Sequence, residues 1–410
     1  MSASTLPASH PHAAVGAART AAQPRLTPGL TLLFAICCGA VVGNLYYAQP
    51  LIELIAPDVG LAPTVAGMIV SITQIGYALG LIFLVPLGDI LENRRLMVST
   101  LLLAILSLAG LAQASSGSAL LACAALVGFS SVSVQVMVPM AATLADDATR
   151  GRDVGTIMSG LIGGVLLSRP LASLLADHLG WRAVFWVAAV VVGLVVALMV
   201  AVMPARRPAH SQPYGQLLAS LVTLTRRHAV LRRRSFYQGC MFGALVLFWT
   251  AVPMELAQHY SYTQSNIAVF GLIGAAGALV APLTGRLADA GHGRQAALVA
   301  FVLALLSLLP AWLFPQTGVI GLCVAGVMLD AAIQVTMVTG QREIYALDAN
   351  SRSRLNSVYV TSIFVGGAAG AALASVLYEH GGWAWVAAAG TALVAMALAR
   401  FLWDGRSPRS

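Results

Sequence analysis

Long apolar stretches occupy most of the chain and restrict it to very few folds. Each is about 20 residues long, the length that a helix needs to cross the hydrocarbon core of a bilayer. They lie at residues 28–52, 64–87, 95–113, 118–144, 154–176, 182–203, 235–257, 266–288, 294–314, 317–341, 355–377 and 383–403. In lipid only helices or closed barrels satisfy their backbone polar groups, and these stretches are too long and too continuously apolar for barrel strands. The sequence therefore predicts an all-α integral membrane protein with twelve transmembrane helices.

The composition excludes an ordinary soluble protein. Hydrophobic residues make up 59% of the chain and charged residues only 9%, whereas a soluble domain carries about 25% charged residues. The net charge of +8 would suit a nucleic-acid-binding protein if the chain were soluble. Here most of the charges lie between the apolar stretches, so we expect the lipid bilayer as a partner and no nucleic acid.

The basic residues indicate the orientation. All 23 are Arg, and all except Arg169 and Arg182 fall on one side of the expected membrane. Cytoplasmic loops carry an excess of positive charge. We therefore expect a multi-pass protein of the bacterial inner membrane with both termini in the cytoplasm.

The apolar stretches form two sets of six that resemble each other. ASLLADHLGW at 172–181 matches ASVLYEHGGW at 374–383 in six of ten positions, and Asp89 corresponds to Asp289 at a second offset, of 200 residues. Such a repeat predicts two pseudo-symmetric six-helix bundles. The expected parts are a disordered cytoplasmic N-terminal tail (1–27), the first bundle (28–203), a basic cytoplasmic linker (204–234), the second bundle (235–403) and a cytoplasmic tail (404–410).

The loop after the second stretch reads PLGDILENRR at 86–95 and resembles the loop signature of the major facilitator superfamily. The first copy matches at Leu87, Asp89, Arg94 and Arg95, and the second copy keeps Gly285, Leu287 and Asp289. With the repeat, the resemblance covers essentially residues 28–403 and implies the major facilitator fold. In that family this loop latches the two halves on the cytoplasmic side. The resemblance therefore implies that Asp89, Arg94, Arg95 and Asp289 belong to a gate.

The fifth stretch carries a second resemblance. Residues 155–173 are similar to the antiporter signature of the drug–proton exporters, and Gly155 and Gly164 fit its spacing. Arg169 stands where that signature has Pro, and Pro170 follows one residue late. The resemblance implies export by antiport. Small residues at helix contacts also serve packing alone, so both interpretations stay open.

Two charged residues lie inside apolar stretches, where charges are costly and usually functional. Arg169 is the predicted substrate or coupling charge, and the alternative is a structural pairing with Glu53 or Glu255. Asp330 is the acidic residue expected deepest in the bilayer, and we predict that it carries the coupling proton. Its alternative is a structural salt bridge.

Polar side chains are scattered among the stretches expected to surround a central cavity. An amphipathic solute would fit amide and aromatic groups amid apolar walls, although each residue would equally serve a contact between helices. The candidate lining residues are Asn44, Tyr47, Gln49, Gln74, Tyr77, Gln135 and Gln334.

These features together predict a secondary-active transporter. We expect a proton-coupled exporter of a small amphipathic organic molecule, such as a drug, siderophore or metabolite, which functions as a monomer. The alternatives are a proton-coupled importer and a membrane sensor that does not transport. No metal motif, phosphate loop or nucleophile elbow appears in the sequence, so we expect no enzyme activity, cofactor, metal or nucleotide.

Overall fold

The computed structural model describes residues 26–146, 149–203, 205, 213–274, 276–277, 292–313, 318–348 and 351–404. The helices of the first half are α1 (Pro28–Gly43), α2 (Ile52–Asp58), α3 (Met68–Phe83), α4 (Asn93–Gln113), α5 (Gly117–Ser130), α6 (Ser133–Leu144), α7 (Arg150–Leu179) and α8 (Trp181–Val202). They are followed by α9 (Tyr214–Arg227), α10 (Ala229–Gln258), α11 (Gln264–Gly274), α13 (Gly293–Leu313), α14 (Gly318–Tyr345) and α15 (Arg352–Asp404). The short 3-10 helices are η1 (Gln49–Leu51), η2 (Pro63–Val65) and η3 (Val85–Asp89).

Length and composition suit these helices to a membrane. Among the described residues, nine segments are long and apolar enough to cross a bilayer, and α1 and α11 are shorter apolar helices. One of the nine, α15, has two arms because Gly382, with a φ of 61°, breaks it. The expected all-α membrane fold is confirmed. The number of twelve spanning helices stays a prediction, since residues 278–291 lie outside the described part of the chain.

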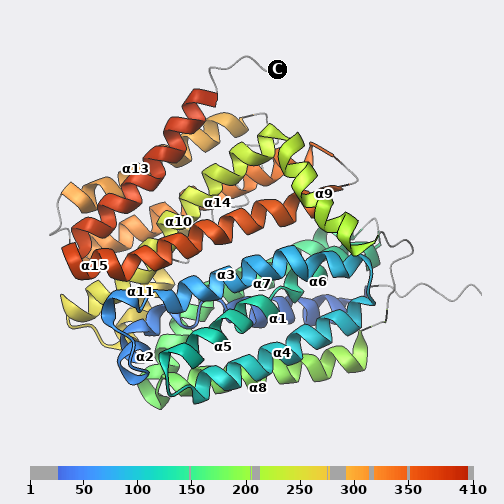
Figure 1. Ribbon diagram of the computed structural model, residues 1–410, viewed down its shortest axis with the longest axis horizontal. Helices are drawn as coiled ribbons and strands as arrows, with labels where there is room; N and C mark the ends of the chain where they lie inside the picture. Colours follow the sequence, from blue (N-terminus) through green and yellow to red (C-terminus); the bar gives the residue numbers. More distant parts are fainter. Residues whose placement is uncertain are drawn as a thin grey trace, which may run out of the picture.

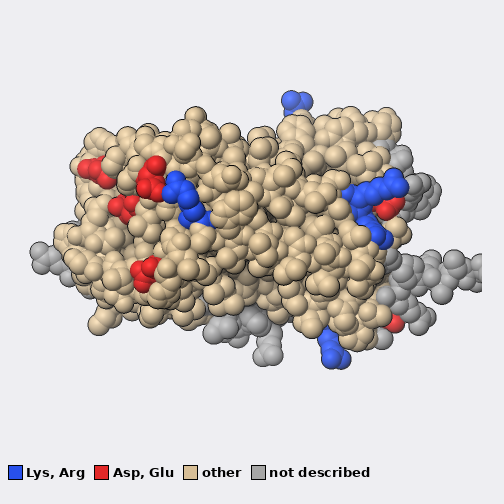
Figure 2. Space-filling model, turned by 90° about the horizontal axis from the view of Figure 1, so that it is seen from below, with Lys and Arg blue, Asp and Glu red and all other residues tan. Residues whose placement is uncertain are grey.

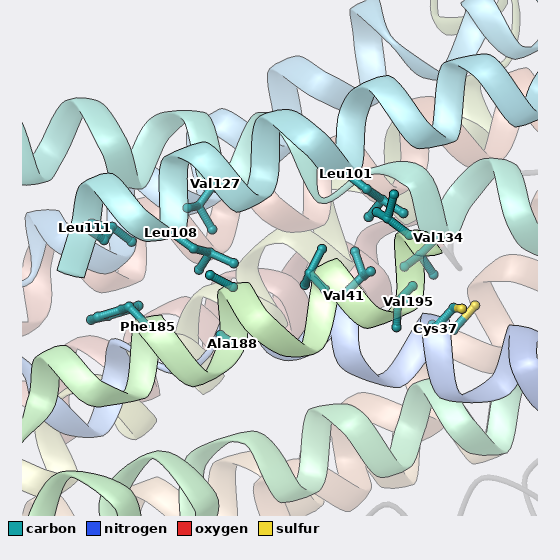
Figure 3. Close-up of a cluster of buried hydrophobic side chains, with 14 of the residues drawn as sticks. Cys37, Val41, Leu101, Leu108, Leu111, Val127, Val134, Phe185, Ala188 and Val195 are labelled. Atoms are coloured by element: carbon teal, nitrogen blue, oxygen red, sulfur yellow. The ribbon is translucent and has the colours of Figure 1, made fainter. Parts of the chain in front are cut away.

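Two groups of helices lie side by side and run along the long axis of the molecule (Figure 1). In one group, buried side chains from α1, α4, α5, α6 and α8 form a continuous apolar core (Figure 3). A second core joins α10, α11, α13, α14 and α15. Below, the first half means residues 28–203 and the second half residues 229–404. A smaller cluster, with Tyr77 from the first half and Phe364 from the second, closes the contact between them.

The same close helix contact occurs in both halves. In the first, a methyl group on Gly164 of α7 would lie 2.2 Å from the carbonyl oxygen of Gly39 in α1. In the second, a methyl group on Gly366 of α15 would lie 2.0 Å from the carbonyl oxygen of Gly239 in α10. Only glycine permits such an approach of two backbones. Because these positions correspond at the two offsets of the sequence repeat, the repeat in sequence is also a repeat in packing.

The first apolar stretch is broken where the site forms. After Gly43 the chain leaves the α-helix and continues through turns and η1 into α2. Residues 44–51 are buried almost throughout, and irregular backbone at membrane depth is tolerated only where protein or a cavity surrounds it. The break brings Tyr46 and Gln49 to the boundary between the halves, where Gln49 bonds to Thr250 of α10.

The segment expected to be a linker contains a helix that the sequence analysis did not predict. In α9, Leu217, Leu221 and Leu224 share one face and are buried. At its start, the Tyr214 hydroxyl donates to the carbonyl oxygen of Phe83, 2.9 Å away, at the end of α3. The connection between the halves therefore contains an amphipathic helix that contacts both of them, η3 of the first half and α10 and α15 of the second, and it crosses one end of the molecule (Figure 1).

Charges separate along the long axis. Acidic side chains gather at the end where α2 and α11 lie, and most of the visible basic side chains lie toward the opposite end (Figure 2). We call these the acidic end and the basic end. At the acidic end, Asp58 accepts hydrogen bonds from Trp181 and Arg182, which hold the pKa of its carboxyl below the usual value. The acidic end is the one we expect to face the periplasm.

Candidate functional site

Arg169 occupies the boundary between the halves. Its Nε donates to the Oε1 atom of Gln49 at 2.8 Å. Its guanidinium carbon lies 5.0 Å from the ring centre of Tyr46 and 4.9 Å from that of Trp249, so two aromatic faces hold the cation. Tyr46 and Gln49 belong to the first half, whereas Trp249 belongs to α10 of the second.

Asp330 reaches the same place from α14. Its Oδ2 accepts a hydrogen bond from the indole nitrogen of Trp249 at 2.9 Å. Arg169 and Asp330 therefore share Trp249, and they are close enough to interact electrostatically. Gln49 adds a second link between the halves, because its Nε2 donates to the Thr250 hydroxyl at 3.1 Å. We call Arg169, Gln49, Trp249, Thr250 and Asp330 the central network.

Two glycines of one segment lie against the charged residues, and the one at position 277 leaves space that a side chain would fill. A methyl group on Gly271 would lie 3.8 Å from Cβ of Arg169, and one on Gly277 would lie 2.6 Å from Cβ of Asp330. One segment of chain thus packs against both members of the charged pair. The structure joins Arg169 and Asp330 through the aromatic ring of Trp249.

The carboxylates considered as structural partners of Arg169 are engaged elsewhere. Glu255 accepts a hydrogen bond from the Tyr378 hydroxyl at 2.9 Å, and Glu53 accepts one from Nε2 of Gln258 at 3.2 Å. The Glu53 contact joins the two halves, as does the hydrogen bond from the backbone nitrogen of Gly67 to Ser375 at 2.8 Å. These polar contacts lie on the side of the acidic end.

A second group of predicted lining residues lies beside the central network. Nε2 of Gln135 donates to the Tyr77 hydroxyl at 3.2 Å, and the Tyr77 ring lies 4.3 Å from that of Phe364 in the second half. The side-chain amides of Asn44 and Gln74 are buried, and neither has a hydrogen-bond partner among the described residues. Leaving a buried polar group unpaired costs about 1–3 kcal/mol. These two amides are therefore available to a polar ligand.

The remaining candidates for the lining are less buried. Tyr47 packs partly against the core of the first half, and its hydroxyl lies near Gly43. Gln334 is half-buried on α14, one turn along from Asp330. In the described part of the chain, neither side chain takes part in the hydrogen bonds of the central network.

The residues expected to form the gate separate into two kinds. Asp89, in η3, lies close enough to Arg354 at the start of α15 for an electrostatic interaction between the halves. Arg94 instead donates to the carbonyl oxygens of Val200 and Met203 at the end of α8, and Arg95 pairs with Glu92 at 3.4 Å. Both Arg contacts stay within the first half. Asp289 lies outside the described residues.

Comparison with known proteins identifies the family. Residues 31–343 match the sequence profile described as Major Facilitator Superfamily. The chain belongs to the major facilitator superfamily. It is 41% identical over 382 residues to an uncharacterized transporter, YgaY, of Escherichia coli O157:H7, across 93% of this chain and 96% of that protein. It is 35% identical to the probable transporter SCO4007 of Streptomyces coelicolor, across 87% of this chain and 83% of that protein.

A solved structure shows the same fold. A POT family transporter in complex with 5-aminolevulinic acid superposes with a TM-score of 0.75 over 93% of this chain and 97% of that one. The sequences are only 14% identical, so the likeness is one of fold alone. The major facilitator family, which the loop signature indicated, is confirmed, and the chain is a membrane transporter of this type.

Two members of the central network were not found from the sequence of this major facilitator transporter. Trp249 and Thr250 lie in an apolar stretch, where an aromatic residue and a hydroxyl give no distinct pattern. The repeat could have pointed to Trp249. The same offset of 200 residues that relates Asp89 to Asp289 also relates Gln49 to Trp249. Extending the repeat along the first stretch would have identified that ring as the counterpart of Gln49.

Proposed function

We propose that this transporter exchanges protons for a small amphipathic organic molecule, and that it is an exporter in the bacterial inner membrane. One observation carries the proposal. Arg169 of the first half and Asp330 of the second both contact Trp249, so two intramembrane charges of opposite sign meet where the halves meet. Intramembrane charges are rare and commonly mark the pathway of a substrate or a proton.

Protonation of Asp330 would weaken the contact between the halves. As a carboxylate, Asp330 attracts Arg169 and accepts the Trp249 hydrogen bond. A proton removes the attraction but leaves an oxygen able to accept. Arg169 also holds Gln49, which bonds to Thr250 across the boundary. Loading the proton therefore loosens Arg169 and favours a different packing of the halves, as a rocking transporter requires.

The unpaired amides support an amphipathic substrate. Asn44 and Gln74 offer donors and acceptors that nothing in the described residues uses. The rings of Tyr77, Phe242 and Phe364 lie next to one another, with centre distances of 4.3 Å and 5.6 Å, and provide an apolar wall. A ligand with a polar head and an apolar body would satisfy both features once the halves separate.

The proposed direction of transport, export, is supported by the sequence of α7 and by the gate residues. The Gly-rich part of α7, which resembles the antiporter signature, packs directly on α1 through Gly164. Arg169 lies in the same helix, so a shift of α7 against α1 would move the central network. At the basic end, the electrostatic attraction between Asp89 and Arg354 joins the halves, and it would be lost when the cytoplasmic side opens. Export begins with that opening.

Proton exchange in inverted membrane vesicles tests the proposal. With an acidic lumen, a pH-sensitive dye reports protons that leave when a compound is added outside. Chloramphenicol, a hydroxamate siderophore and 5-aminolevulinic acid form a first panel. An exporter should release lumenal protons with at least one such compound and accumulate it, and vesicles carrying Asp330→Asn should do neither. Proton movement that requires the compound inside the lumen would instead indicate an importer.

A further inference from the structure

A basic pocket lies at the basic end, away from the central network. It has a volume of about 420 Å³ and opens between the start of α10 and the end of α15. Its lining consists of Ala229, Arg232, Arg233, Phe236 and Arg400. Neither the gate nor the central network uses any of these residues.

The positive charge of this pocket is only partly compensated. Asp404 accepts from two of the three arginines, with 3.2 Å from its Oδ1 to Nε of Arg233 and 3.2 Å from its Oδ2 to Nε of Arg400. The third, Arg232, donates from Nη1 to the carbonyl oxygen of Thr225, 2.9 Å away, at the end of α9. One carboxylate thus pairs with two of the three guanidinium groups, and the third bonds to backbone carbonyl oxygens. Each guanidinium carries five N–H donors, so many donors remain available to an anion.

Aromatic side chains place the pocket at the membrane surface. Phe236 beside it is 46% exposed, and Trp403 at the end of α15 is 68% exposed. Exposed aromatic residues at the ends of spanning helices mark the level of the lipid headgroups. We therefore expect the arginines to lie at the depth of the lipid phosphates, with the exposed Phe236 on the apolar side of the pocket.

We propose that this pocket binds the phosphate of an anionic phospholipid. Arg232, Arg233 and Arg400 contact the phosphate oxygens, while Ala229 and Phe236 border the glycerol and the first carbons of the acyl chains. A free phosphate ion would share the chemistry of the arginines, but it would leave the apolar wall unused. Bound in this way, one lipid ties the start of α10 to the end of α15, next to the junction with α9.

Lipid retention by the purified full-length protein tests the proposal. Native mass spectrometry in detergent compares phosphatidylglycerol with phosphatidylcholine of the same acyl chains. An arginine near a membrane surface contributes about 1 kcal/mol to the binding of anionic lipid, which is about a fivefold change in affinity. We expect Arg232→Gln and Arg400→Gln each to weaken phosphatidylglycerol binding about fivefold, and the double variant to weaken it more.

Two further variants separate this site from general charge and from misfolding. Arg152→Gln removes an exposed arginine at the start of α7 in the other half, and it should bind the lipid as the wild type does. Ala229→Trp fills the pocket without changing its charge, and it should also lose the lipid. Monodispersity and melting temperature confirm that each variant is folded.

Three results would overturn the proposal. Equal retention of the two lipids by the wild-type protein would mean unspecific annular lipid. Unchanged retention in both Ala229→Trp and the double arginine variant would place the lipid elsewhere. Displacement of phosphatidylglycerol by inorganic phosphate at equal concentration would make the pocket a site for soluble anions.

Discussion

At the scale of single residues, Arg169 is held by one hydrogen bond and two aromatic rings. Arg169→Ala should reduce the initial rate of transport about tenfold or more, since a hydrogen bond to a charged group contributes about 1.5–3 kcal/mol. Arg169→Lys should restore only part of the rate, because an ammonium cannot stack between rings and donate from a planar fork. Vesicle transport assays normalised to protein content measure this, with Arg152→Ala as the control. Full activity in Arg169→Ala would remove this residue from the mechanism.

The sequence revealed the two charges of the central network but not the ring between them. Arg169 and Asp330 stood out because charges within apolar stretches are rare. Trp249 did not, since an aromatic residue in such a stretch is compatible with any face of the helix. Likewise, Gln49 was one of several polar candidates, and only the fold shows that it links Arg169 to Thr250. Contacts between distant helices depend on packing that no single stretch encodes.

At the scale of elements, the contact of α1 with α7 depends on glycine. Gly164→Ala should destabilise the protein by about 1–3 kcal/mol, because its methyl group would lie 2.2 Å from a backbone oxygen that cannot easily move. The neighbouring Gly163→Ala is a matched control, since nothing lies within 4 Å of its added methyl group. Thermal unfolding in detergent compares the two. Equal melting temperatures of Gly164→Ala and Gly163→Ala would mean that the close contact of α1 with α7 does not contribute to stability.

Helices long enough to span the membrane were easier to predict from the sequence than short helices. Most of the expected stretches contain a helix, but α7 begins at Arg150 and α10 at Ala229, before the expected stretches at 154 and 235, because arginine-containing turns extend these helices. The amphipathic α9 was missed because it is short and its buried face consists only of Leu217, Leu221 and Leu224. That spacing is the helical signal that a search for long apolar runs ignores.

At the scale of the whole molecule, the two halves must change their relative packing. Asp89→Asn should impair transport and leave expression largely intact, because the lost attraction to Arg354 shifts the equilibrium between states and not the core of either half. Asp289→Asn should impair it less, since its loop keeps a different part of the signature. Transport rates and membrane protein levels are the two readouts. Unchanged rates in both variants would make these ordinary loop carboxylates.

The orientation of the protein in the membrane also concerns the whole molecule. The basic end should face the cytoplasm, together with both termini and the linker, because positive residues are retained on that side. Alkaline phosphatase is active only in the periplasm, so a fusion after Ser211 should be inactive and one after Gly60, near the acidic end, should be active. The reverse pattern would invert the topology and, with it, the assignment of the gate to the cytoplasmic side.

Proton release by the purified protein tests most directly whether Asp330 carries the coupling proton. The compound found active in vesicles is added to wild type and Asp330→Asn in weakly buffered solution containing a pH indicator. The wild type should release protons as the compound binds. The Asn variant, which mimics the protonated carboxyl, should bind the compound without releasing protons and should lose uphill transport. Proton release and uphill transport that both persist in Asp330→Asn would place the coupling site elsewhere and leave Asp330 a structural anchor for Trp249.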